Sequence, residues 1–257
     1  VMVILGVVSP LEAVNAIDWN VIMMLAGTMG TVYLCIESKM PAMVRDMLVN
    51  KLKSVKLIFV ALALFSGFVS AFIDNVATVL MVAPIALAIA KKFNVSPVNT
   101  VLTVAVSSNL QGAATLVGDT TSILLAGYAG MDFMDFFVID GKPGMFWIVQ
   151  AGAMATIPIL FWIFRNEKNR IETTEITKVT DFMPTYALLA TVTSLVIASF
   201  IPNKPALTNG LICVFFFIAV LRYEVGKDEP VATGHDAVLA IDFDTLLLLS
   251  GLFVIIQ

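Results

Sequence analysis

Charge is the property that this sequence has least of. Charged side chains make up 13% of the 257 residues, whereas hydrophobic side chains make up 59%. An ordinary soluble domain carries about 25% charged residues, so these proportions exclude a soluble enzyme, and we expect no nucleic-acid partner. The hydrophobic residues form runs long enough to cross about 30 Å of hydrocarbon. The sequence therefore predicts a multi-pass protein of the plasma membrane, with the lipid bilayer as its main partner.

Cysteine and catalytic motifs are also scarce. Cys35 and Cys213 are the only cysteines, and each lies inside an apolar run, so we expect buried thiols and no disulfide framework. The sequence contains no His-Glu-x-x-His motif, no Gly-x-Ser-x-Gly motif and no phosphate-binding loop. We predict that the protein is not an enzyme and holds no resident cofactor.

Apolar runs divide the chain into candidate membrane segments. They cover residues 1–8, 21–36, 57–90, 98–129, 144–164, 185–201, 206–221 and 243–257. The first and last runs are shorter than a full crossing, so we expect the sequence to be a fragment of a longer carrier. Residues 37–56 mix basic side chains with Met and Leu, which is typical of a helix lying at the membrane interface.

The segment 57–90 is interrupted near its middle by Asp74 and Asn75. Its 34 residues are too few for two ordinary crossings with a turn, and no aqueous loop separates its halves. We therefore predict a re-entrant helical hairpin with Asp74 and Asn75 at its tip, surrounded by protein or by a water-filled cavity. An ionisable side chain at membrane depth costs at least about 2.5–3.5 kcal/mol on insertion scales, so Asp74 marks a functional site.

A second polar interruption lies within 98–129. Eleven of the sixteen residues from Ser107 to Ser122 are polar or glycine. Glycine lowers the cost of leaving helical geometry, and Ser, Asn and Thr offer oxygen atoms to freed backbone groups or to an ion. Secondary transporters hold cations with such unwound carbonyls and half-helix ends. The sequence therefore predicts a discontinuous helix over 98–129.

Basic residues fall unevenly on the two sides of the predicted membrane. If 37–56 is cytoplasmic and the hairpin enters and leaves on that side, 13 of the 15 basic residues are cytoplasmic and 2 lie outside. This is the bias that the positive-inside rule describes. The sequence thus predicts cytoplasmic segments at 37–56 and 165–184. The second of these links a first transmembrane repeat, 1–164, to the start of a second, 185–257.

Residues 13–30 and 237–254 form an internal repeat. They align without a gap at an offset of 224, and seven of the 18 positions are identical, including Asp18 and Asp242. The predicted topology puts Asp18 outside and Asp242 inside, so the two copies run in opposite directions. Inverted repeats of this kind are typical of secondary transporters. The same offset predicts a second hairpin beyond Gln257.

These motifs together resemble the ion transporter superfamily. The resemblance rests on the hairpin tip, the Ile17-Asp18-Trp19 start and the pattern Ser-Asn-x-x-Gly-x-x-Thr-x-x-Gly-Asp at 108–119. Within it the sequence resembles the arsenite-pump/sodium–proton antiporter branch, which includes the melanosomal P protein and is related to citrate and dicarboxylate carriers. The resemblance implies an all-α, inverted-repeat secondary transporter.

The resemblance also implies which residues form the transport site. They are Asp74, Asn75 and Thr78 at the hairpin tip, and Ser108, Asn109, Gly112, Thr115, Gly118 and Asp119 in the discontinuous helix. The sequence departs from the family at Gln111, where glycine is frequent, and at 119–122, where Asp-Thr-Thr-Ser replaces Asp-Pro-Pro-Asn. These departures leave the substrate open.

The carboxylate of Asp74 at the predicted tip limits which classes of substrate can bind there. Carboxylate-carrier relatives have Ser-Asn-Thr at this place, whereas Asp74 would repel a dianion in a low-dielectric site. An aspartate suits a metal cation or a proton. We therefore expect sodium–proton antiport, with sodium held by Asp74, Asn75 and Asn109 and with sodium or a proton as the coupling ion. The alternatives are an arsenite or anion permease, because a neutral solute tolerates the aspartate, and a carboxylate carrier.

Other interpretations of the same residues stay open. Asp74, Asn75 or Asp119 would also serve as helix N-caps, with Asn75 the best suited at the tip, and Asp18 at an interface is more typical of a cap than of a transport site. Two aspartates at membrane depth also suggest an intramembrane aspartyl protease. That family requires Gly-x-Gly-Asp, and here Leu116 stands at the first glycine. A purely structural membrane protein, and a homodimer as the assembly, are also compatible with the sequence.

Overall fold

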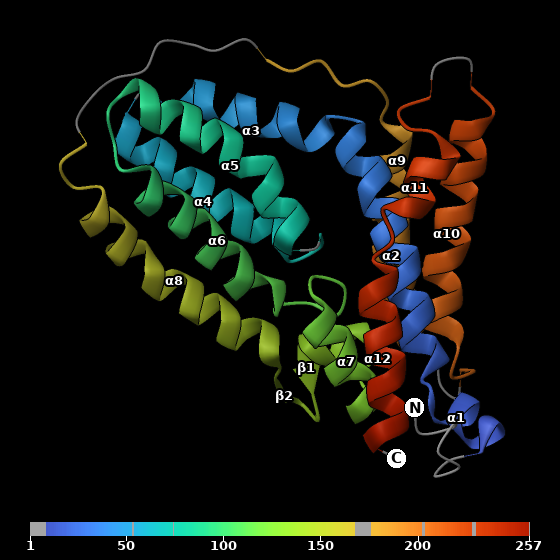
Figure 1. The fold of residues 1–257 in the computed structure, drawn as a ribbon. Helices are drawn as coiled ribbons and strands as arrows, with labels where there is room; N and C mark the ends of the chain where they lie inside the picture. Colours follow the sequence, from blue (N-terminus) through green and yellow to red (C-terminus); the bar gives the residue numbers. More distant parts are fainter. Residues whose placement is uncertain are drawn as a thin grey trace. The chain divides into compact units, whose positions relative to one another are not determined.

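The computed structural model describes residues 9–52, 54–73, 75–167, 176–201, 204–227 and 230–256. Most of these residues are helical, as the apolar runs predict (Figure 1). The first apolar run, residues 1–8, lies outside the described residues, and so does Asp74.

The helices follow the predicted segments. They are α1 (Pro10–Ala16), α2 (Trp19–Glu37), α3 (Met40–Lys51), α4 (Val55–Ser70), α5 (Asn75–Lys92), α6 (Pro97–Gly112), α7 (Thr120–Ala129), α8 (Met145–Ile163), α9 (Met183–Ser199), α10 (Thr208–Val225), α11 (Gly234–Leu239) and α12 (Phe243–Ile256). The helix predicted within 37–56 is α3, and the segment 57–90 forms α4 and α5 with a short turn between them.

A small non-α element departs from the predicted all-α fold. After α7 the chain forms a 3₁₀ helix, η1 (Phe133–Phe136), and the two-residue strands β1 (Val138–Ile139) and β2 (Lys142–Pro143). The strands pair antiparallel. Asp140 and Gly141 between them have positive φ angles of 49° and 72°. Such angles at both central residues favour a tight hairpin turn.

Four stretches among the described residues are long and apolar enough to cross a membrane. They are Trp19–Glu37, Met145–Ile163, Thr208–Val225 and Gly234–Ile255. By contrast, α4 has 16 residues, which is about 24 Å at 1.5 Å per residue and shorter than the hydrocarbon thickness. This length agrees with a hairpin that does not cross the membrane, although its depth in the membrane stays a prediction.

The chain divides into two compact units. The inserted unit comprises residues 32–186, and the split unit comprises residues 1–31 and 187–257. In the inserted unit, α4, α5 and α8 share an apolar core that includes Val55, Phe59, Ala90 and Phe164. The rings of Phe59 and Phe164 lie 4.9 Å apart. This core fixes the two arms of the hairpin and so positions its tip.

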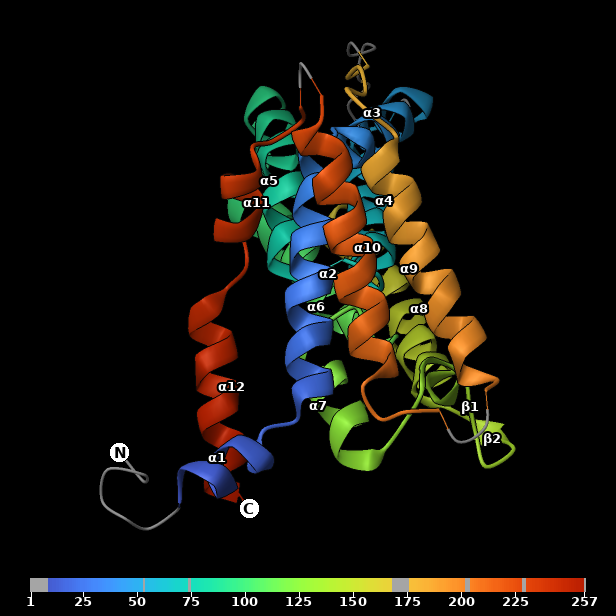
Figure 2. The ribbon, with the colours of Figure 1, turned by 90° about the vertical axis from the view of Figure 1, so that its right-hand side faces the viewer.

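In the split unit, α2 and α10 pack at very short range and lie side by side (Figures 1 and 2). A Cβ on Gly27 would lie 2.6 Å from the backbone nitrogen of Val214, and one on Gly210 would lie 2.8 Å from the carbonyl oxygen of Asn20. The Gly210 N–H also donates to Asn20 Oδ1 at 2.8 Å. Only small residues allow helices to approach this closely.

The two copies of the internal repeat have the same local structure. Ser9 and Thr233, 224 positions apart, cap α1 and α11 by accepting the N–H of the third residue on, at 3.2 and 3.1 Å. Asp18 and Asp242 cap α2 and α12 in the same way, at 3.2 and 3.0 Å. The expected cap at Asp18 is therefore confirmed. In Figures 1 and 2, α12 runs in the direction opposite to α2, and the inverted repeat itself stays a prediction.

The two loops predicted to be cytoplasmic touch each other. Asp46 of α3 is only 3% exposed, and its Oδ2 accepts the backbone N–H and the hydroxyl of Thr177 at 3.0 and 2.5 Å. The Thr180 N–H donates to the carbonyl of Ser38 at 3.0 Å. Residues 37–56 and 176–180 therefore lie on one side of the protein, as the charge bias predicts.

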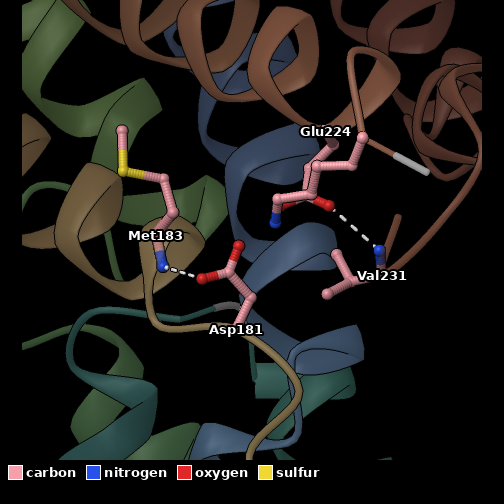
Figure 3. Close-up of polar contacts among 5 residues, drawn as sticks. Asp181, Met183, Glu224 and Val231 are labelled. Atoms are coloured by element: carbon pink, nitrogen blue, oxygen red, sulfur yellow. Dashed lines mark hydrogen bonds and ion pairs between the residues drawn. The ribbon is translucent and has the colours of Figure 1, made fainter. Parts of the chain in front are cut away.

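Two carboxylates hold backbone segments at helix ends (Figure 3). Asp181 Oδ1 accepts the N–H of Met183 at the start of α9, at 3.0 Å. Glu224, near the end of α10, is fully buried and accepts the Val231 N–H at 2.9 Å and the Lys227 ammonium at 2.8 Å. These partners offset the cost of burying the Glu224 charge.

Candidate functional site

The hairpin tip is the turn between α4 and α5. Ala71 follows the last residue of α4 as its C-cap, and α5 begins at Asn75. Ala71 and Ile73 are 3% and 5% exposed. Ala71 and Ile73 are therefore enclosed by protein, which is the condition that a turn within the membrane would have to meet. The position of Asp74 lies outside the described residues.

The discontinuous helix appears as α6 and α7. Ser96 caps α6 by accepting the Asn99 N–H at 3.4 Å, and Pro97 occupies the first turn, where a missing N–H costs little. The first half ends at Gly112 and the second begins at Thr120, so residues 113–119 are not helical. The break falls within the polar stretch 107–122 that the sequence singles out.

Two polar contacts join the tip to the last turns of α6. The side-chain nitrogen Nδ2 of Asn75 donates to Asn109 Oδ1 at 2.5 Å, and Ser108 Oγ donates to the backbone carbonyl of Asn75 at 3.1 Å. Ser108 is fully buried, whereas Asn109 is exposed. The structure thus brings Asn75 to Ser108 and Asn109, which follow it by 33 and 34 residues in the sequence.

The break packs against the other side of the tip. Thr115 Oγ1 donates to the backbone carbonyl of Ala71. A Cβ on Gly118 would lie 2.7 and 2.8 Å from the carbonyl oxygens of Ser70 and Ala71, and 2.5 Å from that of Gly112. Backbone oxygens of the tip and the break therefore converge around Gly118, where no larger residue fits.

Thr78 and Asp119 contribute in different ways. Thr78 is fully buried, and its hydroxyl donates at 3.5 Å to the carbonyl of Ile73, so it closes the tip from within. Asp119 is half-buried at the start of α7, and its Oδ2 accepts the hydroxyl of Thr121 at 2.7 Å. The Asp119 side chain accepts no backbone N–H of α7. The side-chain cap considered for Asp119 is therefore not formed, and a carboxylate stays beside the break.

An open pocket of about 250 Å³ adjoins the tip. It is lined by Asn75, Val76 and Val79 of α5 and by Ala105 and Asn109 of α6. The two amides that bridge the tip and α6 therefore also face a space that a small solute can enter. The described lining is neutral and, apart from these amides, apolar.

Asn75 does not cap α5 in the expected way. The helix begins at Asn75 itself, and the side-chain nitrogen donates to Asn109. A cap needs the side-chain oxygen to accept a backbone N–H. Because Asn109 lies within hydrogen-bond distance across the tip, the Asn75 amide joins two elements instead of ending one.

Three further polar side chains lie near the site. Ser70 and Ser122 are buried, and their hydroxyls have no hydrogen-bond partner among the described residues. Ser70 Oγ lies 3.5 Å from the place that a Cβ of Gly112 would occupy. Gln150 of α8 pairs with Gln111, and a lone glutamine in an apolar run gives no sign of its partner. Unpaired buried hydroxyls are unusual, but burial is known only from the fold.

The oxygen atoms at the tip and the break suit a hard cation. Among the residues that the structure describes, no three His, Cys, Asp or Glu side chains gather as a metal cluster. The atoms that converge are backbone carbonyls, hydroxyls and amide oxygens, which alkali and alkaline-earth cations prefer over soft metals. Asp119 adds one carboxylate beside them.

The citrate transporter family matches residues 1–257 of the sequence. The chain belongs to this family. An uncharacterized transporter of Mycobacterium tuberculosis is 28% identical over 259 residues, which cover 94% of this chain and 56% of that protein. A Dictyostelium discoideum transporter named arsB is 24% identical over 168 residues, 65% of this chain and 29% of that protein. The P protein of Mus musculus is 27% identical over 112 residues, 42% of this chain and 13% of that protein.

The resemblance to the ion transporter superfamily is therefore confirmed. This citrate transporter family member is similar both to the transporter named arsB and to the P protein, which the resemblance places in one branch of that superfamily. The chain spans about half the length of the mycobacterial relatives that it matches. The family is one of membrane transporters, and it points to no catalytic activity.

Proposed function

We propose that this citrate transporter family member is part of a secondary transporter that works by alternating access in the plasma membrane. The leading candidate for its transport activity is sodium–proton antiport. The hairpin tip and the break between α6 and α7 form one half of the transport site. The second hairpin implied by the 224-residue offset supplies the other half, as in carriers built from inverted repeats.

The contact between the tip and the break supports this proposal most directly. Carbonyl oxygens of Ser70, Ala71 and Gly112 converge around Gly118, and the Asn75–Asn109 pair joins the tip to α6. An ion that leaves water needs protein oxygens to replace its hydration shell. Unwound backbone is the usual source of such oxygens in carriers.

Asp74 supplies the charge in this mechanism. In a site of low dielectric, a carboxylate attracts a cation strongly and repels an anion. Sodium and a proton then compete for the same carboxylate. Since only one of them is bound at a time, movement of the site in one direction with sodium and in the other with a proton couples the two fluxes.

Asp74→Asn in the full-length carrier tests the role of this charge. The substitution keeps the side-chain volume and one oxygen but removes the charge and the titratable proton. Loss of a charged ligand costs about 1.5–3 kcal/mol, so we expect sodium-dependent proton movement to fall roughly tenfold or more. Dye-quench antiport in everted vesicles, with sodium, lithium and potassium tested separately, measures it.

Asp18→Asn is the matched control because it makes the same chemical change at a helix cap. Asparagine caps helices as well as aspartate does, so antiport should be unchanged. Undiminished cation-dependent proton movement in the Asp74→Asn carrier would rule out the charge-based mechanism.

A carboxylate carrier is the second candidate, and the description of the family favours it. A carboxylate would meet the Asp74 charge and a pocket whose described lining has no basic side chain, so a cation would have to bind with it. The Dictyostelium relative favours arsenite efflux as a third candidate. Vesicles tested with labelled citrate and with arsenite distinguish them. Transport of either solute without any proton response to cations would move that activity to first place.

A further inference from the structure

A reciprocal amide pair links α6 to α8 beside the break. Gln111 Nε2 donates to Gln150 Oε1 at 3.2 Å, and Gln150 Nε2 donates to Gln111 Oε1 at 2.8 Å. Both side chains are half-buried. Each amide uses the donor and the acceptor of the other, so the pair forms only when both glutamines are present.

Gln111 lies in the last turn of α6, directly before Gly112. Its backbone carbonyl accepts the N–H of Ala114 at 2.9 Å, inside the non-helical segment 113–119. Its Cγ lies 2.9 Å from the place that a Cβ of Gly67 would occupy, so a larger residue at Gly67 of α4 would displace it. Gln111 therefore contacts α4, α8 and the break at once.

The beginning of α8 packs against both the tip and the break. Ala71 of the tip, Ala114 of the break and Val149 of α8 are buried together, with Phe72 and Phe146 packed against them. Gln150 follows Val149 directly in the sequence. The amide pair thus adds two directed hydrogen bonds to an apolar contact that alone fixes no orientation.

We propose that Gln111 and Gln150 are positioning residues that hold the segment 113–119 against the hairpin tip. The inference rests on the proposed function, because converging oxygens bind an ion well only while their spacing is kept. The pair is neutral, so a change of pH does not alter its charge. Removal of one partner leaves the other amide unsatisfied in a partly buried place, which destabilises the segment.

The labelling rate of a cysteine placed at Ala114 tests this inference in the full-length carrier with Cys35→Ala and Cys213→Ala. Ala114 is fully buried, so a membrane-permeant maleimide should react slowly with Ala114→Cys. Gln111→Ala or Gln150→Ala should each speed labelling about tenfold, as expected for the loss of two amide hydrogen bonds. The double variant should label no faster than the faster single variant, because the two residues act as one unit.

Thr156→Ala is the matched control on α8. The Thr156 hydroxyl donates to the backbone carbonyl of Ala153 within α8 at 2.7 Å. Loss of this hydroxyl should therefore leave the labelling rate unchanged. Gln150→Glu keeps the acceptor for Gln111 and loses the donor, so an intermediate rate is expected even if the alanine variants fold poorly. Two results would overturn the amide pair as a positioning device. One is single-variant labelling rates within about twofold of the parent rate. The other is a double variant whose fold increase in labelling rate equals the product of the two single-variant increases.

Sodium protection separates this inference from the proposed function. Sodium should slow labelling of Ala114→Cys in the parent, and the Gln variants should need roughly tenfold more sodium for half of the same maximal protection. A general loss of folding would lower the maximal protection instead. If sodium does not protect the parent, the sodium site is wrong, while the labelling rates without sodium still decide the role of the pair.

Discussion

At Gly118 a single methyl group decides whether the hairpin tip and the break fit together. The atoms that a Cβ would meet are the carbonyl oxygens of Ser70 and Ala71, at 2.7 and 2.8 Å. Backbone oxygens cannot rotate away as the end of a flexible side chain can. An added methyl group must therefore push the two segments apart.

Gly118→Ala should lower the free energy of unfolding of the full-length carrier by about 1–3 kcal/mol, the usual cost of overpacking. It should also reduce sodium-dependent transport per folded molecule, because the converging oxygens are displaced. Thermal unfolding in detergent and vesicle transport measure the two effects.

Gly152→Ala in α8 is the control for this substitution. Its Cβ would meet only side-chain carbons of Leu110, at 3.7 and 3.9 Å, which is ordinary contact. In a helix interior, alanine is favoured over glycine by up to about 1 kcal/mol, so stability should hold or rise. Equal losses in the two variants would contradict the role assigned to Gly118.

Much of the candidate site could be predicted at the residue scale, because polar atoms in an apolar segment need partners. Asn75, Ser108 and Thr115 stand out in the sequence for that reason, and the structure gives each a partner across the tip. Gln150 could not be predicted, since its partner depends on how α8 packs against α6, and no local pattern encodes that packing. The cap expected at Asn75 was wrong for the same reason.

Helix caps are the clearest recurring feature at the scale of the element. Asp18 and Asp242 keep the same hydrogen bond although only seven of 18 aligned positions are identical. In α1, the backbone N–H and hydroxyl of Ser9 lower the pKa of Glu12 by bonding its carboxylate. This part of the cap is therefore present at neutral pH and is lost as the pH falls through that lowered pKa.

Asp18→Ala should lower the stability of the full-length carrier by about 0.5–2 kcal/mol, because two N–H groups at the start of α2 lose their acceptor. Asp18→Asn should change it by no more than a few tenths of a kcal/mol. Thermal unfolding of the two variants side by side is the measurement. An asparagine variant as unstable as the alanine variant would mean that the charge of Asp18, and not its capping oxygen, is what matters.

Long apolar elements could be predicted from the sequence, and short irregular ones could not. The boundaries of α8, α9 and α10 fall close to the apolar runs 144–164, 185–201 and 206–221. Strands of two residues leave no alternating pattern to detect. The β1–β2 hairpin instead depends on the positive φ angles at Asp140 and Gly141.

At the scale of the whole molecule, the Asp46–Thr177 contact constrains the topology. The two residues are 131 positions apart, with the hairpin, the discontinuous helix and α8 between them. The chain must therefore return to the side from which it left. The 13-to-2 distribution of basic residues assigns that side to the cytoplasm in our proposal.

Lys178→Cys and Lys142→Cys should be labelled from opposite sides of the membrane. Both side chains are exposed, so a maleimide that does not cross membranes should reach Lys178→Cys only in everted vesicles. It should reach Lys142→Cys only in right-side-out cells. Labelling of both from the same side would contradict the predicted orientation and the inverted repeat that depends on it.

The order of the two units along the chain has a consequence for biosynthesis. The inserted unit is continuous, so its loop contact at Thr177 can form as soon as that loop leaves the ribosome. In the split unit, Asn20 of α2 meets Gly210 only 190 residues later. In a nascent chain stalled before α10, the inserted unit would therefore be complete while the glycines of α2 still face lipid or the insertion machinery.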